Sequence, residues 1–181
     1  MSDPYDELFR AIGRTVYEWS WLESDIAHFV FDLTACHSAA FYDDSGVSRV
    51  SALLHANISL RTNIEIAKSL AYSMDGPEGF FDRVEKSLNI VANDLRNERN
   101  RYAHDLWYMA GSGSVRLKPG SKFKREKGTG ETNETLASEE RFTDVAQVHD
   151  LANRIHNKRK EVMALSSEAQ EHYRRRNPSQ E

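Results

Sequence analysis

Apolar residues recur every three or four positions along much of the chain, which is the spacing of one face of an α-helix. The first such stretch, residues 6–34, carries the stripe Leu8, Ile12, Val16, Trp19, Leu22, Ile26, Phe29, Val30 and Leu33. The second, residues 48–74, carries Val50, Leu53, Leu54, Ile58, Arg61, Ile64, Ala67, Ala71 and Met74. Each stretch predicts one continuous helix, and the second helix has an arginine in an apolar slot.

Two further stretches follow, at residues 78–105 and 143–167. Their stripes are Phe81, Val84, Leu88, Val91, Leu95 and Tyr102 in the first, then Val145, Val148, Ala152, Ile155, Val162 and Leu165 in the second. Asp75-Gly76-Pro77 ends the second predicted helix, and Asp144 can cap the fourth. The pattern predicts an all-α fold, an antiparallel up-and-down bundle of four helices.

Residues 106–142 interrupt the helical pattern between the third and fourth helices. Residues 107–110 and 114–117 flank Gly111-Ser112-Gly113, which is typical of a β-hairpin. A basic run follows and then an acidic one. The basic run indicates either an arm that contacts a polyanion or a solvated loop whose two halves attract each other. We expect a single domain over 1–181, with its core at about 5–167 and a frayed tail at 168–181.

Composition narrows the classes of protein that remain. The chain has 181 residues, a formal net charge of −4 and one cysteine, so no internal disulfide forms. Cys36 is expected to pack as a small buried apolar residue. No run of 18 apolar residues and no signal-peptide core occur, so we expect a soluble cytoplasmic protein with no membrane partner. The net charge does not indicate nucleic-acid binding, so any such argument depends on local patches.

The densest local patch is the run Arg96–Asp105, at the end of the third predicted helix. At about 100° per residue, Arg96, Asn100 and His104 lie four apart on one strip of that helix. Arg99 lies about 100° away, toward the apolar stripe. The phasing therefore places this guanidinium at the boundary between the core and the polar face.

Ordinary helix electrostatics offers a second interpretation of the same residues. Cations near a helix C-terminus gain about 0.3–1 kcal/mol from the helix dipole. A guanidinium at a core boundary also needs a partner, such as Glu98 or Glu23, because an unpaired buried charge is strongly unfavourable. In this interpretation the cluster consists of structural ion pairs.

The residue types also fit metal-independent RNA cleavage, in which the 2′-hydroxyl attacks the adjacent phosphorus. His104 can transfer a proton near neutral pH, and Arg99 can grip phosphate oxygens. Asn100 can donate to the phosphate or orient the histidine, while Arg96 and Arg101 can guide the RNA backbone. The products are a 2′,3′-cyclic phosphate and a 5′-hydroxyl end. One chain supplies only one such histidine, and a symmetric dimer would supply the second.

The segment Arg99-Asn100-Arg101-Tyr102-Ala103-His104 resembles the Arg-x(4–6)-His motif of HEPN domains, with four residues between arginine and histidine. The four-helix pattern extends the resemblance over about residues 5–167, and the hairpin lies outside the family pattern. The resemblance implies a metal-independent endoribonuclease with catalytic Arg99 and His104 and a supporting Asn100. It also implies a homodimer with a composite active site.

HEPN proteins occur in toxin–antitoxin, abortive-infection and other antiviral systems. The resemblance therefore implies a toxin or antiviral-defence effector with a separate antitoxin or regulatory partner. The family also contains inactive, nucleotide-binding and scaffold members. The alternative function is a non-catalytic dimerisation or partner-binding module.

Aromatic and basic residues around the motif add candidate RNA contacts. Trp19 fits the apolar stripe and is expected in the core, whereas Trp21 lies off the stripe and suits an interface. Trp107 and Tyr108 either flank an RNA groove or pack the hairpin onto the bundle. The predicted RNA-binding or supporting residues are Arg96, Arg101, Tyr102, Trp107, Lys122, Lys124 and Arg125.

Other chemistries have weaker support in the sequence. A di-iron bundle needs repeated Glu-x-x-His pairs, and the nearest approach is a single Asp25-Ile26-Ala27-His28. The histidines show no zinc-ligand spacing. No nucleophile triad and no glycine-rich phosphate loop before a helix can be identified. We therefore predict no metal and no cofactor.

Overall fold

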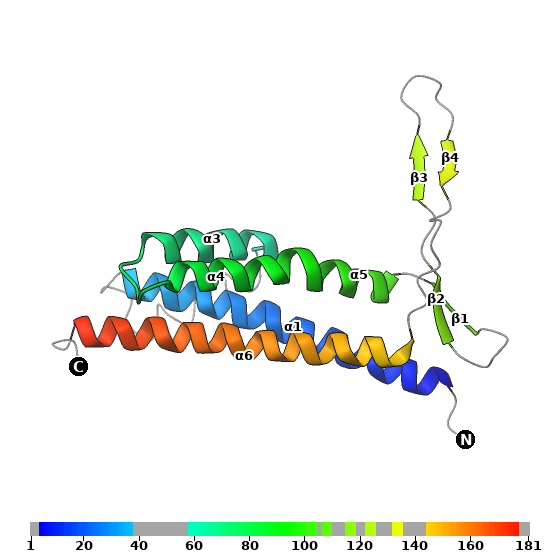
Figure 1. The fold of residues 1–181 in the computed structure, drawn as a ribbon, viewed down its shortest axis with the longest axis horizontal. Coiled ribbons are helices and arrows are strands. Elements are labelled where there is room, and N and C mark those ends of the chain that lie inside the picture. Colours follow the sequence, from blue (N-terminus) through cyan, green and yellow to red (C-terminus); the bar gives the residue numbers. More distant parts are fainter. Residues whose placement is uncertain are drawn as a thin grey trace.

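The computed structural model describes residues 4–37, 58–104, 106–109, 115–118, 122–125, 132–135 and 144–177. For the four strands and for Pro4, His37 and His104, only the backbone is described. The chain is mainly helical, as predicted (Figure 1). The helices are α1 (Pro4–His37), α3 (Leu60–Ser73), α4 (Phe80–Asn89), the π-helical turn η2 (Ile90–Leu95), α5 (Arg96–His104) and α6 (Val145–Arg176).

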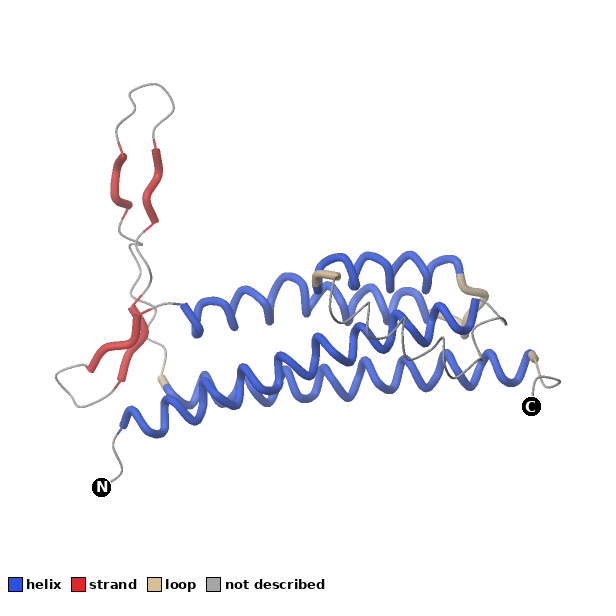
Figure 2. Tube along the Cα trace, turned by 180° about the vertical axis from the view of Figure 1, so that it is seen from behind, coloured by secondary structure: helices blue, strands red, loops and turns tan. Residues whose placement is uncertain are grey.

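Helices α1 and α6 lie side by side along most of their length and run in the same direction (Figures 1 and 2). Residue numbers therefore rise together across the contact: Arg14 binds Asn153, Glu18 binds His156 and Asp32 binds Ser166. Helix α3 runs with them, and the continuous rod α4–η2–α5 runs the opposite way. The alternating directions predicted for the four helices are therefore wrong. Relative direction depends on the connections, and residues 38–57 between α1 and α3 lie outside the described residues.

The second predicted helix, residues 48–74, is not continuous. Ser59 has extended backbone angles (φ −66°, ψ 150°), and its hydroxyl oxygen accepts a hydrogen bond from the Thr62 amide at 3.2 Å. A serine in this geometry is a helix N-cap, so α3 begins at Leu60. Arg61 lies in the first turn of α3 and is exposed rather than placed in an apolar slot. Residues 48–57 lie outside the described residues.

The third predicted helix is continuous from Phe80 to His104, but its middle is a π-helical turn. The Arg96 amide donates to the Val91 carbonyl, five residues back rather than four. A π-turn changes the angular step per residue, and such turns are frequent at functional sites. Five of the six predicted stripe residues are buried: Val84, Leu88, Val91, Leu95 and Tyr102. The sixth, Phe81, is half-buried, and Phe80 lies in the core instead.

The core lies between α1, α3, the α4–η2–α5 rod and α6, and Trp19 belongs to it as predicted, at 3% exposure. Val16 is exposed, which corrects its place in the predicted stripe. Thr15 takes the inward position instead, because its hydroxyl donates to the Ala11 carbonyl and also lies within hydrogen-bonding distance of the Val148 carbonyl. Cys36 is half-buried against the core. None of the described helices has both the length and the apolar character that a membrane crossing requires.

Helix α6 is longer than predicted. Asp144 caps its start, as expected, in a capping box with Gln147. The segment predicted as a frayed tail, 168–181, is helical as far as Arg176. Ala169 is fully buried there, and His172 and Arg176 both contact the Asp75 carbonyl, at 2.9 and 3.0 Å. These contacts hold the last turns of α6 against the α3–α4 connection.

Between α5 and α6 the structure describes four short strands in two antiparallel pairs. Strand β1 (Leu106–Met109) pairs with β2 (Val115–Lys118), and β3 (Lys122–Arg125) pairs with β4 (Thr132–Thr135). Both pairs extend beyond the end of the helices where α5 ends and α6 begins (Figures 1 and 2). The sequence pattern indicated only the first pair.

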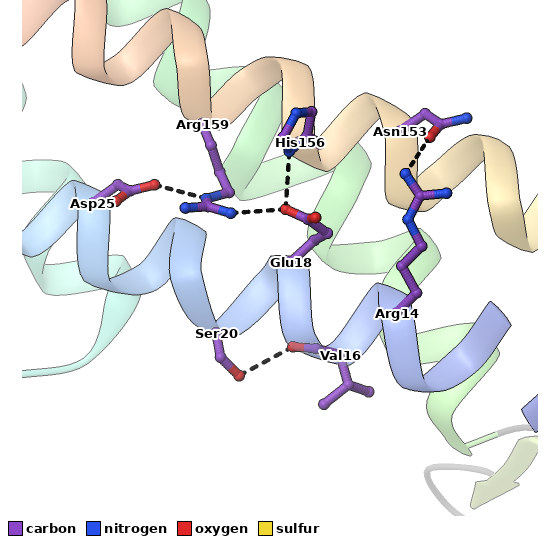
Figure 3. Close-up of polar contacts among 8 residues, drawn as sticks. All are labelled: Arg14, Val16, Glu18, Ser20, Asp25, Asn153, His156 and Arg159. Carbon is purple, nitrogen blue, oxygen red and sulfur yellow. Dashed lines mark hydrogen bonds and ion pairs between the residues drawn. The ribbon is translucent and has the colours of Figure 1, made fainter. Parts of the chain in front are cut away.

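An ion cluster joins α1 to α6 in the middle of their contact (Figure 3). The Arg159 guanidinium donates to Glu18 and to Asp25, both at 2.8 Å, and His156 Nδ1 lies 3.2 Å from Glu18. Figure 3 shows Glu18 and Asp25 projecting from α1 toward the two α6 residues. Arg159 also lies over the Trp21 ring, 5.4 Å from its centroid. Each charge in the cluster has an opposite charge next to it, so the cluster fixes the register of the two helices.

Burial raises the pKa of the Glu18 carboxyl, because its charged form is separated from water. The hydrogen bonds and charges of Arg159 and His156 outweigh that effect and hold the pKa below the ordinary value of 4.5. A carboxyl whose pKa is lower in the folded state contributes stability above its unfolded pKa. That contribution disappears as the pH falls through the folded pKa.

We therefore expect Glu18→Gln to lower the free energy of unfolding at pH 7 by about 1–3 kcal/mol, because the charged acceptor of Arg159 is lost. The difference from the parent protein should narrow as the pH falls from about 5 toward 3. Urea denaturation at several pH values measures both effects. Glu7→Gln, an exposed glutamate of the same helix, is the matched control and should change little. A Glu18→Gln deficit that stays constant between pH 7 and 3 would contradict the assignment.

Candidate functional site

Helix α5 carries the Arg-Asn-x-x-x-His motif on the last turns of the α4–η2–α5 rod. Arg99 is half-buried, as its phase relative to the stripe predicted. One of its terminal nitrogens donates to the Asn100 side-chain oxygen at 3.0 Å. The guanidinium carbon lies 5.7 Å from the centroid of the Trp19 ring. Arg99 is thus held between an amide on its own helix and an indole ring on α1.

No carboxylate pairs with Arg99 among the described residues. The two partners expected from the sequence are engaged elsewhere: Glu98 binds Arg154, and Glu23 accepts a hydrogen bond from the Trp19 indole at 2.9 Å. The Nε atom of Arg99 is buried and has no hydrogen-bond partner. An unsatisfied polar group of this kind costs about 1–3 kcal/mol. Among the described residues, the positive charge of Arg99 therefore has no carboxylate beside it.

Arg159 is a structural arginine whose environment can be compared with that of Arg99. Both guanidiniums lie over a tryptophan ring, at 5.7 Å for Arg99 and 5.4 Å for Arg159. Arg159 has two carboxylate partners, whereas Arg99 has a neutral amide. A permanently charged, preorganised guanidinium without a carboxylate is suited to bind an external anion, such as a phosphate.

Neighbouring residues hold α5 against α6. The Glu98 carboxylate accepts a hydrogen bond from the Arg154 guanidinium at 2.8 Å and from the Tyr102 hydroxyl at 3.1 Å. Burial raises the pKa of Tyr102 to about 12, and the adjacent negative charge of Glu98 adds to the effect. Tyr102 is thus a buried, neutral hydrogen-bond donor. Its predicted role in supporting the motif fits this position better than direct contact with RNA.

The other predicted site residues divide into two groups. Arg96 is exposed, one helical turn before Asn100, and Arg101 is half-buried. The backbone of His104 ends α5, but its side chain lies outside the description. The same holds for the side chains of the four predicted contacts in the strands, Trp107, Lys122, Lys124 and Arg125.

Sequence reasoning missed the partners that come from other helices. Trp19 was predicted to be a core residue, but its contact with Arg99 joins α1 to α5 and leaves no trace in local spacing. Arg154 on α6 was likewise missed. In the separate Glu18–Arg159–Asp25 cluster both carboxylates bind the guanidinium, so we assign the cluster a structural role. Among the described residues, no group of three or more His, Cys, Asp or Glu side chains that could hold a metal ion was found.

Comparisons of this chain with protein-family models, with curated proteins and with solved structures give no match.

The different environments of the two arginines predict opposite effects on stability. Arg99→Met keeps an unbranched apolar stem and removes the buried, unpartnered Nε, so we expect no loss in the free energy of unfolding and a gain of up to about 2 kcal/mol. Arg159→Met leaves two carboxylates without their cation and should cost about 2–4 kcal/mol. Urea denaturation at pH 7 measures both. A loss at Arg99 as large as that at Arg159 would show that Arg99 is an ordinary structural residue.

Proposed function

We propose that this protein is a metal-independent endoribonuclease whose catalytic residues are Arg99 and His104, with Asn100 in support. The observation that carries the proposal is the preorganised Arg99 guanidinium, which has a ring and an amide around it but no carboxylate among the described residues. The resemblance of residues 99–104 to the HEPN motif supports the same reaction. The π-turn immediately before α5 is a further feature frequent at functional sites.

In the proposed reaction the RNA supplies its own nucleophile, the 2′-hydroxyl next to the scissile phosphate. Arg99 binds the nonbridging phosphate oxygens and neutralises the charge that grows on them. The side-chain oxygen of Asn100 accepts from Arg99, so its amide group remains to donate to the phosphate. His104 transfers a proton at the 2′-oxygen or the 5′-oxygen. The P–O5′ bond breaks, leaving a 2′,3′-cyclic phosphate and a 5′-hydroxyl.

The reaction needs one group to accept a proton and another to donate one. A single motif contains one histidine, so the proposal includes a homodimer in which two copies of the motif face one cleft. In this arrangement the His104 side chains of the two subunits share the acid and base roles. An antiviral or toxin role with a separate regulatory partner, as in proteins with the same motif, belongs to this proposal.

A second candidate function is a non-catalytic dimerisation or partner-binding module. One observation favours it: Phe9, Val16, Tyr17 and Trp21 are all exposed on α1. Phe9 and Val16 lie two helical turns apart, and Tyr17 and Trp21 lie four apart, so these residues gather on the outer side of the helix. Exposed aromatic residues in such an arrangement are typical of an interaction surface. The same face also suits the dimer that the first proposal needs.

The catalytic assignment predicts that Arg99→Ala and His104→Ala each reduce cleavage of a labelled RNA oligonucleotide by at least about 100-fold. Both variants should keep the far-ultraviolet circular dichroism of the parent. Cleavage by the parent should persist in excess EDTA, and mass spectrometry should find 2′,3′-cyclic phosphate ends. His28→Ala, a variant of an exposed histidine on α1, is the control and should cleave normally. Parent-like cleavage by both motif variants would refute the assignment.

Dimerisation through the outer face of α1 predicts that the double variant Phe9→Glu and Tyr17→Glu sediments as a monomer at concentrations where the parent is a dimer. Two carboxylates in an apolar interface remain unpaired, and unpaired charges are costly to bury. Tyr72→Glu introduces a carboxylate at an exposed aromatic residue of α3 and should not change the sedimentation coefficient. If the double variant remains a dimer, this face is not the interface.

A further inference from the structure

A groove runs between α3 and the α4–η2–α5 rod, on the approach to the candidate site. Its volume is about 370 Å³. One side carries Arg61, Glu65 and Lys68 of α3, and the other carries Asn89, Asn93 and Arg96 of the rod. Volumes of about 300 Å³ and above are typical of small-ligand sites. We call this feature the α3–α5 groove.

The charge of the groove favours an anion. Three cations face one carboxylate, Glu65. Lys68 is partly engaged, since it donates to Asn89 at 2.7 Å and lies 3.8 Å from Glu65. Arg61 on one wall and Arg96 on the other have no ion pair with any described residue. The groove thus has on each wall a guanidinium, the kind of group that binds phosphate oxygens.

Amide side chains give the groove a second kind of chemistry. Asn89, Asn93 and Asn97 line it, and each amide group carries both hydrogen-bond donors and an acceptor. Leu60 and Ala92 add apolar surface to the lining. Cations for a phosphate, amides for base edges and apolar surface for a base face are the groups that bind a nucleotide of a single strand.

The π-turn and the groove occupy the same part of the rod. Ala92 and Asn93 lie within η2, and Asn89 and Arg96 flank it on either side. A π-turn changes the directions of the side chains around it, and such turns are frequent at functional sites. The helical spacing of the sequence predicts that Arg96, a residue of the groove, shares one strip with Asn100 and His104. The strip therefore leads from the groove to the candidate catalytic residues.

We propose that the α3–α5 groove binds a nucleotide of single-stranded RNA next to the scissile phosphate. Arg61 and Arg96 hold the phosphate, and Asn93 contacts the base. From Arg96 to His104 the helix rises about 12 Å, so one strand can occupy the groove and the motif together. This inference rests on the proposed ribonuclease function and deepens it, because it assigns the substrate class of the site.

Binding of a fluorescent 2′-O-methyl oligoribonucleotide of roughly eight nucleotides tests the inference on the full chain without cleavage, because the attacking hydroxyl is blocked. Fluorescence anisotropy should show that Arg61→Ala and Arg96→Ala each weaken binding by about 3- to 10-fold. Arg10→Ala, an exposed arginine of α1, is the matched control and should bind like the parent. Asn93→Ala leaves the net charge unchanged, so weaker binding by that variant separates a groove contact from a general charge effect.

Parent-like binding by Arg61→Ala, Arg96→Ala and Asn93→Ala overturns the groove assignment, whether or not the protein cleaves RNA. Failure of the parent to bind the oligonucleotide overturns it as well. A parent that binds through the groove but does not cleave unmodified RNA leaves the groove assignment standing and refutes the ribonuclease proposal. Unchanged circular dichroism of the three variants shows that each binding change is local.

Discussion

The parallel contact between α1 and α6 determines where the side chains around Arg99 lie. The Glu18–Arg159–Asp25 ion pairs fix its register, and the Thr15 hydroxyl lies within hydrogen-bonding distance of the Val148 carbonyl across the same contact. With α1 held in this way, Trp19 is presented to the remaining helix rod. The Arg154–Glu98 pair then ties α5 to α6 at a defined height. Arg99 lies over Trp19 because both contacts are satisfied at once.

Arg99 and Arg159 each lie over a tryptophan ring, but they differ in whether a carboxylate binds them. The Arg159 guanidinium pairs with two carboxylates of α1, and these ion pairs hold α6 against α1. Arg99 has no carboxylate partner among the described residues, and its buried, unpartnered Nε carries an energetic cost. Proteins retain such costs mainly where a ligand supplies the missing partner. Arg61 and Arg96 of the α3–α5 groove likewise have no ion pair with a described residue.

The helical pattern was sufficient to predict the mainly helical fold and most of the residues that face the core, with Val16, Arg61 and Phe81 as exceptions. It also placed Arg99 correctly at the core boundary, because Leu95 and Tyr102 bracket it at helical spacing. The pattern failed where the answer depended on long-range geometry. Ser59 interrupts a run that looks periodic, and Thr15 replaces Val16 inside only because α6 offers it a carbonyl. Helix direction likewise depends on connections that periodicity does not describe.

The candidate residues of the site were chosen from the sequence, but the residues that contact them from other helices were not predicted. The motif is local in sequence, so spacing could reveal it, whereas the ring beneath Arg99 and the groove beside Arg96 come from other helices. The prediction that Glu98 or Glu23 pairs with Arg99 was wrong, because Glu98 binds Arg154 and Glu23 binds the Trp19 indole. Arg99 therefore has an amide and an aromatic ring beside it, and no carboxylate among the described residues.

We propose that Arg99 has no carboxylate partner among the described residues because its guanidinium binds an RNA phosphate. The salt dependence of RNA binding tests it most directly, since each phosphate contact on a single strand contributes about 0.7 to the slope of log K against log salt concentration. With a non-cleavable oligoribonucleotide, we expect Arg99→Met to reduce that slope by the share of about one phosphate contact. An unchanged slope, with unchanged affinity, would contradict it.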